Sequence, residues 1–158
     1  MDTLQQMTGV WLYGGYFLLS VVSALFPWVN AEILVLSMSA LARTPSALIL
    51  VVLIGTAGQM AGKTVLYWAG RGTLHLGLRN ITRTAEGWHE RLKKYRWGPY
   101  TLMFLSATVG VPPFYVMTVA SGALKIPFVP FVLLCTAGCT IRFGLLVFMP
   151  RLLIALFR

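Results

Sequence analysis

Long apolar runs with very few charged positions dominate the pattern of this chain. Only five charged residues lie within positions 1–70 and 97–141: Asp2, Glu32, Arg43, Lys63 and Lys125. Runs of this length exceed the roughly 20 apolar residues that cross the hydrocarbon core of a bilayer. The pattern therefore predicts an all-α integral membrane protein with at least three membrane segments.

Composition supports this prediction. Hydrophobic residues make up 58% of the chain and charged residues 11%, with a mean hydropathy of +0.77, whereas soluble domains average about 25% charged residues. The 158 residues are expected to form a single membrane domain, 1–158. The start, "MDTLQQMTGV", contains no Lys or Arg, so we expect no cleavable signal and the first apolar run to remain in the membrane.

The positive charge gathers in one stretch, which we predict to be a cytoplasmic loop at 71–97. Seven of its residues are basic: Arg71, Arg79, Arg83, Arg91, Lys93, Lys94 and Arg96. Apolar residues recur there at helical spacing: Ile81, Ala85, Trp88, Leu92 and Tyr95. A basic amphipathic helix on anionic headgroups fits this pattern, and lipid is a better partner than nucleic acid for so apolar a chain.

The stretch "AGQMAGKT", residues 57–64, satisfies a loosened phosphate-loop pattern. A phosphate loop needs a buried strand before it and an acidic residue elsewhere to help hold Mg²⁺, and no carboxylate follows an apolar strand here. Gly58 and Gly62 instead fit the small-residue spacing that lets membrane helices approach closely. His75 and His89 have no partners at ligand spacing, and Cys135 and Cys139 fit packing positions, so no metal, cofactor or enzymatic activity is expected.

The chain resembles itself at an offset of about eighty residues. "ALARTP" from Ala40 recurs as "ALKIP" from Ala123, and "TAGQMAGK" from Thr56 recurs as "TAGCTIRFG" from Thr136. Each unit begins with a proline-broken apolar segment, "FPWVNAE" or "VGVPPFY". The order of these matches predicts two repeats, at about 9–70 and 98–150, on either side of the basic loop.

Proline removes a backbone donor, and irregular backbone at membrane depth is tolerated only where protein or a water-filled cavity receives it. We therefore predict re-entrant segments at Pro27 and at Pro112 and Pro113, each followed by a transmembrane helix. The single span between them, from Ser46 to Gly70, would place the two segments on opposite leaflets. The fold class expected is thus an all-α inverted repeat, the layout of a transporter or flippase.

Three intramembrane charges are the candidate binding residues for substrate or protons: Glu32, Lys63 and Arg142. Buried membrane charges are costly and normally face a cavity or a partner. Lys63 and Arg142 suit the phosphate of an anionic lipid, and Glu32 suits proton exchange or displacement from the two cations. The competing interpretation is structural, with Glu32 neutralising one of the cations to hold the bundle together.

Several segments resemble the DedA family, also called the VTT domain or SNARE-associated Golgi protein family. "FPWVNAEILVLSMSALA" resembles its Pro-x-x-x-x-Glu re-entrant segment, and "AGQMAGKTVLYWAGRG" its Gly-x-x-x-Gly, Tyr, Gly-Arg span. "GVPPFYVMTVASGALKIPFVPFVL" resembles the second re-entrant segment of the short, YqaA-like branch. The resemblance gives structural roles at helix breaks and packing contacts to these residues: Pro27, Pro112, Pro113, Gly58, Gly62, Tyr67, Gly70 and Arg71.

The resemblance implies a lipid flippase or scramblase of the bacterial inner (plasma) membrane, acting in membrane homeostasis. Its lipid partner would be an anionic phospholipid or a polyprenyl phosphate, and the chain is compatible with a homo-oligomer. The sequence departs from the family at two places: Lys63 stands where an Asp is frequent, and "ATVGVPP" lacks the arginines of an Arg-rich segment. Two alternatives stay open, a small-solute or cation transporter or channel and a non-transporting membrane scaffold.

Overall fold

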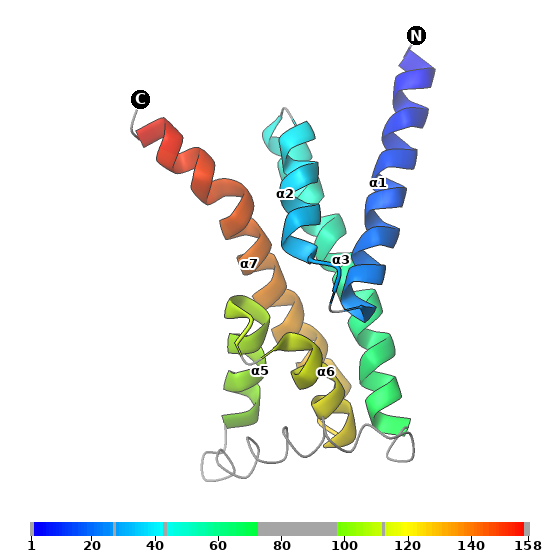
Figure 1. Ribbon diagram of the computed structural model, residues 1–158, viewed down its shortest axis with the longest axis vertical. Coiled ribbons are helices and arrows are strands. Elements are labelled where there is room, and N and C mark those ends of the chain that lie inside the picture. The colour runs from blue at the N-terminus through cyan, green and yellow to red at the C-terminus, as the bar shows by residue number, and fades with distance from the viewer. Residues whose placement is uncertain (1, 27, 43, 73–97, 112, 157–158) are drawn as a thin grey trace. The chain divides into compact units, whose positions relative to one another are not determined.

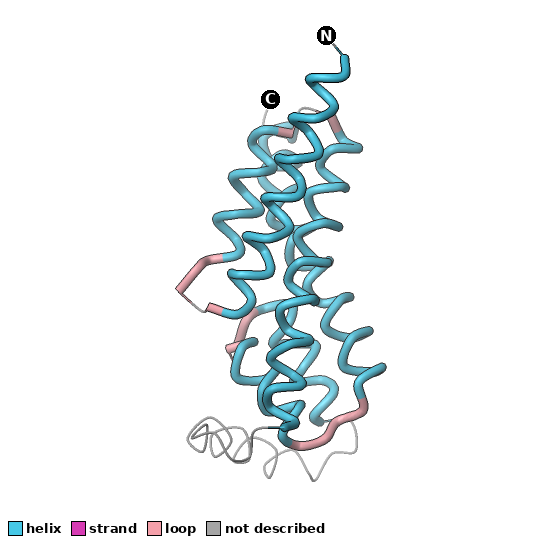
Figure 2. The backbone as a smooth tube through the Cα atoms, turned by 90° about the vertical axis from the view of Figure 1, so that its right-hand side faces the viewer, coloured by secondary structure: helices cyan, strands magenta, loops and turns pink. Residues whose placement is uncertain are grey.

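A computed structural model describes residues 2–26, 28–42, 44–72, 98–111 and 113–156, and nearly all of these residues are helical. No strand occurs among these residues, and short loops join the helices (Figures 1 and 2). The helices are α1 (Asp2–Leu25), α2 (Ala31–Leu41), α3 (Pro45–Gly72), α5 (Gly98–Val109), α6 (Phe114–Ala123) and α7 (Phe128–Leu156).

Contacts divide the chain into two compact units. The first unit comprises Met1–Gly62 with Phe143–Arg158, and the second comprises Lys63–Arg142. The division falls inside the two long helices α3 and α7. Along the chain, a helix, a break, a shorter helix and a long helix follow one another twice. The inverted relation of the two halves and their re-entry into a bilayer stay predictions.

Local sequence explains where the helices begin. The Asn30 side chain accepts a hydrogen bond of 2.8 Å from the Glu32 N–H and so caps α2. Thr44 accepts one of 3.3 Å from the Ala47 N–H at the start of α3, where Pro45 stands at the first helical position. Proline is favoured there because its missing N–H would have had no partner within the helix.

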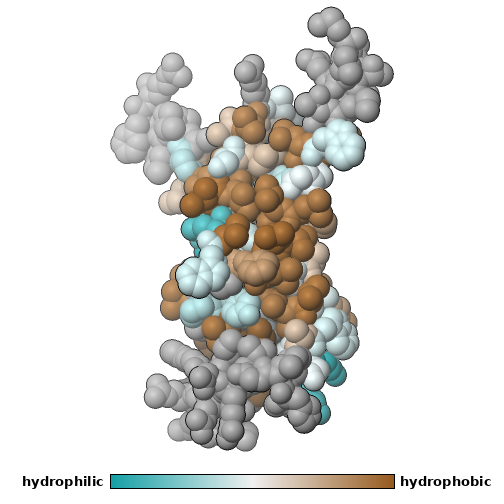
Figure 3. All heavy atoms as spheres, turned by 45° about the vertical axis from the view of Figure 1, so that its right-hand side comes forward, coloured by the Kyte–Doolittle hydropathy of each residue, from teal (hydrophilic) through white to brown (hydrophobic). Residues whose placement is uncertain are grey.

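Within the part of the chain that the structure describes, two helices are long and apolar enough to cross a membrane, Pro45–Gly72 and Phe128–Pro150. The first and third apolar runs each form more than one helix. The first run forms α1 and α2, and the third forms α5, α6 and the beginning of α7, because caps and prolines interrupt the helices. In α7 only 33% of the most apolar stretch is buried, and Figure 3 shows a face on which apolar side chains predominate. That exposure suits contact with lipid.

In the first unit, α1 packs against α2 and runs antiparallel to it (Figure 1). The glycines of the small-residue pattern lie where α3 meets α1: a Cβ on Gly58 would stand 2.6 Å from the Ser20 Cβ, and one on Gly62 2.6 Å from the Ala24 Cβ. Beside them, Gln59 Nε2 donates to the Ser20 carbonyl at 3.0 Å and also to Ser23 Oγ. The stretch 57–64 is thus helix within α3, as predicted, and provides no loop to wrap a nucleotide phosphate.

The second unit is organised around α5 and α6, which form an antiparallel hairpin (Figure 1). Gly122 of α6 and Gly70 of α3 allow these two helices to touch through their backbones. A Cβ on Gly122 would collide with the Tyr67 carbonyl oxygen, and one on Gly70 would collide with the Val119 carbonyl oxygen. Contacts this close fix the position of α6 against α3.

Candidate functional site

The turn between α5 and α6 is the centre of the candidate site. Gly110 ends α5 with its N–H donating to the Ser106 carbonyl at 2.9 Å, and its φ of +85° is a left-handed conformation that favours glycine. Pro113 then caps α6 without a side-chain hydrogen bond. The first N–H groups of α6 consequently point out of the helix toward the turn, with the positive end of the helix dipole.

Lys63 contributes the first cation at this turn. Its side chain is 5% exposed, and its ammonium nitrogen lies 4.0 Å from the ring centroid of Phe114, the first residue of α6. A desolvated cation over an aromatic face gains about 2 kcal/mol. That contact does not supply a hydrogen-bond acceptor, and among the residues that the structure describes none is found for this ammonium group.

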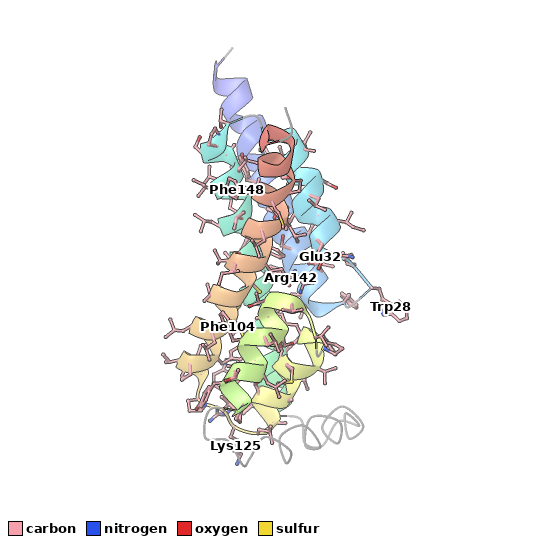
Figure 4. The ribbon with its side chains drawn as sticks, turned by 90° about the vertical axis from the view of Figure 1, so that its left-hand side faces the viewer. Trp28, Glu32, Phe104, Lys125, Arg142 and Phe148 are labelled. Carbon is pink, nitrogen blue, oxygen red and sulfur yellow. The ribbon has the colours of Figure 1, made fainter. Side chains whose placement is uncertain are left out.

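Arg142 contributes the second cation, from α7. Its Nη1 and Nη2 atoms lie 3.1 and 3.2 Å from the position that a Cβ on Gly110 would take. The half-buried guanidinium therefore rests against the end of α5, beside the turn (Figure 4). Helix C-termini present carbonyl oxygens and a negative partial charge, which stabilise a cation. Any side chain on Gly110 would crowd the guanidinium.

Lys63 and Arg142 meet this turn from two different helices, α3 and α7, and Cys135 and Cys139 also belong to α7. Both cysteines are buried and unbridged, which agrees with their predicted packing role.

Both cations lie far from the ends of their helices. Lys63 is nine residues from Gly72 at the end of α3, and Arg142 is fourteen residues from Phe128 at the start of α7. At 1.5 Å per residue these separations are about 13 and 21 Å. Both cations therefore lie well inside helices that are long and apolar enough to cross a membrane.

Other predicted site residues have different outcomes. Glu32 lies in the first turn of α2 (Figure 4), within the first unit, whereas Lys63 and Arg142 lie in the second. The convergence of all three charges therefore stays a prediction. Pro27, Pro112 and the predicted interfacial helix within 73–97 lie outside the described residues.

Another cluster of the second unit is centred on Tyr67, with Arg71 bonded to it and Gly70 packed against Val119 of α6. The fully buried Tyr67 donates a hydrogen bond of 2.6 Å to the Ile126 carbonyl in the turn between α6 and α7, and it accepts one of 2.6 Å from Arg71 Nη1. Its ring stacks on Phe131 at a centroid distance of 4.8 Å. These contacts link α3, the turn and α7.

Tyr67→Phe should lower the thermal stability of the purified protein, because it leaves the Ile126 carbonyl and Arg71 without their shared hydroxyl. A buried group deprived of its partner costs about 1–3 kcal/mol. Thermal unfolding in detergent measures the change, with Tyr13→Phe as a half-buried control in α1. Equal losses in both variants would show that the Tyr67 hydroxyl contributes nothing specific.

Sequence reasoning missed two features of the site, the ring of Phe114 over Lys63 and the place of Gly110 against Arg142. A glycine just after an apolar helix is a recognisable termination signal, so "TVGVPP" contained a cue for Gly110. No local pattern links Lys63 to Phe114, because fifty-one positions separate them.

Comparison with known families shows that the model of the VTT domain matches residues 15–152. Searches among curated proteins and among solved structures gave no match. The matched region contains all six helices in whole or in part, and both cations of the candidate site. The chain is therefore a membrane protein that belongs to the VTT-domain family, the DedA and SNARE-associated Golgi protein family.

Proposed function

We propose that this protein moves a phosphate-headed lipid across the bilayer, with the turn between α5 and α6 as the binding place of the phosphate. Membership of the VTT-domain family supports a role in membrane transport. The observation that carries the lipid proposal is the placement of Lys63 and Arg142 on either side of this turn.

The chemistry of the turn matches a phosphate better than a neutral or cationic solute. An ammonium group, a guanidinium group and the first N–H groups of α6, which has no side-chain cap, are donors of three kinds around one short loop. Charge-assisted hydrogen bonds to phosphate are about twice as strong as neutral ones. Half-helix N-termini receive anionic substrate groups in the same way in other transporters.

The lengths of the helices support a path for the headgroup. The twelve residues of α5 and ten of α6 measure about 18 and 15 Å, less than the roughly 30 Å of hydrocarbon. A hairpin of that length brings its turn to the middle of a bilayer without crossing it. We propose that the phosphate passes this turn while the tail stays in the surrounding lipid. The lipid is an anionic phospholipid or a polyprenyl phosphate, the membrane is the bacterial inner membrane, and the role is transport without catalysis.

The test is translocation in liposomes. Fluorescent phosphatidylglycerol in the inner leaflet is protected from a membrane-impermeant quencher until it flips. With the wild-type protein, the inner-leaflet lipid should flip outward and be quenched. Lys63→Met should slow this flipping about ten- to hundredfold, since a hydrogen bond to a charged group contributes about 1.5–3 kcal/mol. Val65→Met, on an exposed position of the same helix, is the matched control and should behave as wild type.

Two further results separate the alternatives. Flux of a small cation or neutral solute through the same liposomes, sensitive to Lys63→Met, would favour a solute transporter. Well-folded wild-type protein without any lipid or solute flux would contradict the proposal and favour a scaffold.

Lys63→Arg keeps the charge but changes the geometry, so we expect it to retain more translocation than Lys63→Met.

A further inference from the structure

A second feature of the second unit lies away from the turn, where α5 and α7 begin. A cavity of about 670 Å³ opens there, with almost entirely apolar walls. Six residues line it: Tyr100, Thr101, Phe104, Pro130, Leu133 and Leu134. Its volume lies within the range of about 300–1,000 Å³ that small-molecule sites occupy. We call this cavity the α5–α7 groove.

The environment of the groove indicates what fills it. Leu133 is 65% exposed, and α7 is one of the two helices suited to span the membrane. A groove on such a surface opens to lipid, and alkyl chains are the apolar material available there. Pro130 has no N–H and Leu134 is apolar, so the α7 side presents no donor that would require a polar ligand.

The polar contribution to the groove lies at one end. Tyr100 and Thr101 belong to the first turn of α5, and Phe104 follows one turn later. An occupant with a polar head and an apolar chain therefore has a preferred direction, with its head at the beginning of α5. Ten residues separate Tyr100 from Gly110, or about 15 Å along the helix. The groove is consequently a place distinct from the phosphate turn.

Two cations lie near the turn that precedes α7, and they favour an occupant with a negatively charged head. Lys125 is exposed in the turn before α7 (Figure 4), and Arg71 is held beside that turn through Tyr67, which bonds Ile126. We call Lys125 and Arg71 the cationic rim. Among the described residues, none of those that form the lining or the rim is acidic.

The conformation of Lys125 is a separate observation. α6 ends in a Schellman motif, with the Lys125 N–H bonded to the Gly122 carbonyl at 3.0 Å and the Ile126 N–H bonded to the Ser121 carbonyl at 3.0 Å. Lys125 occupies the left-handed position of this motif with φ 54°, which glycine fills more favourably. A lysine kept at a position where backbone energetics favour glycine points to a use for its charge.

We infer that the α5–α7 groove binds one alkyl chain of an anionic lipid, whose phosphate head lies at the cationic rim. This site deepens the proposed function and rests on it, because the lipid held here is the class of lipid proposed to reach the turn about 15 Å away. Occupancy of the groove does not itself require translocation, so the two ideas are tested separately.

The experiment uses the full chain in liposomes and phosphatidylglycerol with a photoreactive diazirine in one acyl chain. After illumination, mass spectrometry locates the labelled peptides. Labelling at Phe104 and Leu134 should fall about tenfold when excess unlabelled phosphatidylglycerol is added, and much less with phosphatidylcholine. Labelling of exposed positions such as Leu145 reports bulk lipid and should respond equally to both competitors.

Three variants make the test specific. Leu134→Trp fills the groove and should remove labelling at Phe104, whereas Leu105→Trp, on an exposed position of α5, should not. Lys125→Gly suits the backbone of the Schellman motif, so it should fold well, keep groove labelling and lose the preference for phosphatidylglycerol. Inorganic phosphate should not compete, because it has no chain.

Two outcomes would overturn the inference: groove labelling that responds to both competitors as bulk lipid does, or groove labelling unchanged in Leu134→Trp. Lys63 does not line the groove, so the Lys63→Met variant should keep groove labelling while it slows translocation. Saturable groove labelling together with absent translocation in the wild-type protein would keep the groove and reject the flippase.

Discussion

Replacing Gly122 with alanine should destabilise the protein by about 3 kcal/mol or more, one of the largest losses expected from a single added methyl group. The new Cβ would collide with the Tyr67 carbonyl oxygen and stand 2.9 Å from the Arg71 nitrogen. Both are backbone atoms of α3, so neither can rotate away. Overpacking of this kind costs about 1–3 kcal/mol and occasionally more.

Helix propensity acts in the opposite direction but is the smaller effect. Alanine is favoured over glycine inside a helix by about 1 kcal/mol. Gly144→Ala isolates that gain, because a Cβ on Gly144 in α7 meets nothing within 4 Å. We therefore expect Gly144→Ala to raise the melting temperature in detergent and Gly122→Ala to lower it. A higher melting temperature for both variants would show that α6 does not press against α3 at this point.

Features encoded by neighbouring residues were predictable from the sequence. "ALARTP" and "ALKIP" each stand where a shorter helix ends and a long helix begins, around Pro45 and just before Phe128. A proline near the start of a helix and a basic residue in the preceding turn are short-range signals. The stretch "AGQMAGKT" was predicted to be helical from the regular spacing of its glycines, and it lies within α3.

Features that depend on tertiary contact were not predictable. Gly122 looks like one small residue among many in "VASGALK", and only the fold shows that it touches the backbone at Tyr67. The residues at which the helices inside an apolar run begin and end were also not predictable. Charge marks where a run ends, but the caps and prolines that divide a run into two or three helices have a weaker signature than the hydropathy itself.

The candidate site shows the same division. An intramembrane lysine and arginine were recognisable by their cost, and the structure places them at one turn. The sequence could not indicate which turn, because Arg142 reaches Gly110 from another helix and Lys63 reaches Phe114 from a third. The predicted partnership with Glu32 involves the other unit, and it needs an experiment.

Glu32→Gln should fold and reach the membrane yet lose lipid translocation in liposomes. The glutamine keeps the size of the side chain and the backbone N–H that bonds Asn30, so α2 retains its cap. The change removes a negative charge from the first turn of α2, where the helix dipole stabilises it by about 0.3–1 kcal/mol. A modest loss of stability is therefore expected even without any ion pair.

A purely structural ion pair predicts a different pattern. Removing one partner of a buried pair costs about 3–5 kcal/mol, because the remaining charge is uncompensated, and neutralising the second partner restores much of that loss. One set of variants therefore comprises Glu32→Gln, Arg142→Gln and the variant with both changes. A parallel set comprises Glu32→Gln, Lys63→Met and the variant with both of these changes. Melting temperature and translocation are measured on the same preparations.

The two roles separate in the double variants. If Glu32 exchanges a proton or is displaced when the phosphate arrives at Lys63 and Arg142, neutralising a cation as well damages the phosphate site further and translocation stays lost. If Glu32 only balances charge, the single variants unfold at lower temperature and the double variant recovers stability. Normal translocation by well-folded Glu32→Gln would remove Glu32 from the working residues and leave the cationic turn between α5 and α6 to act without it.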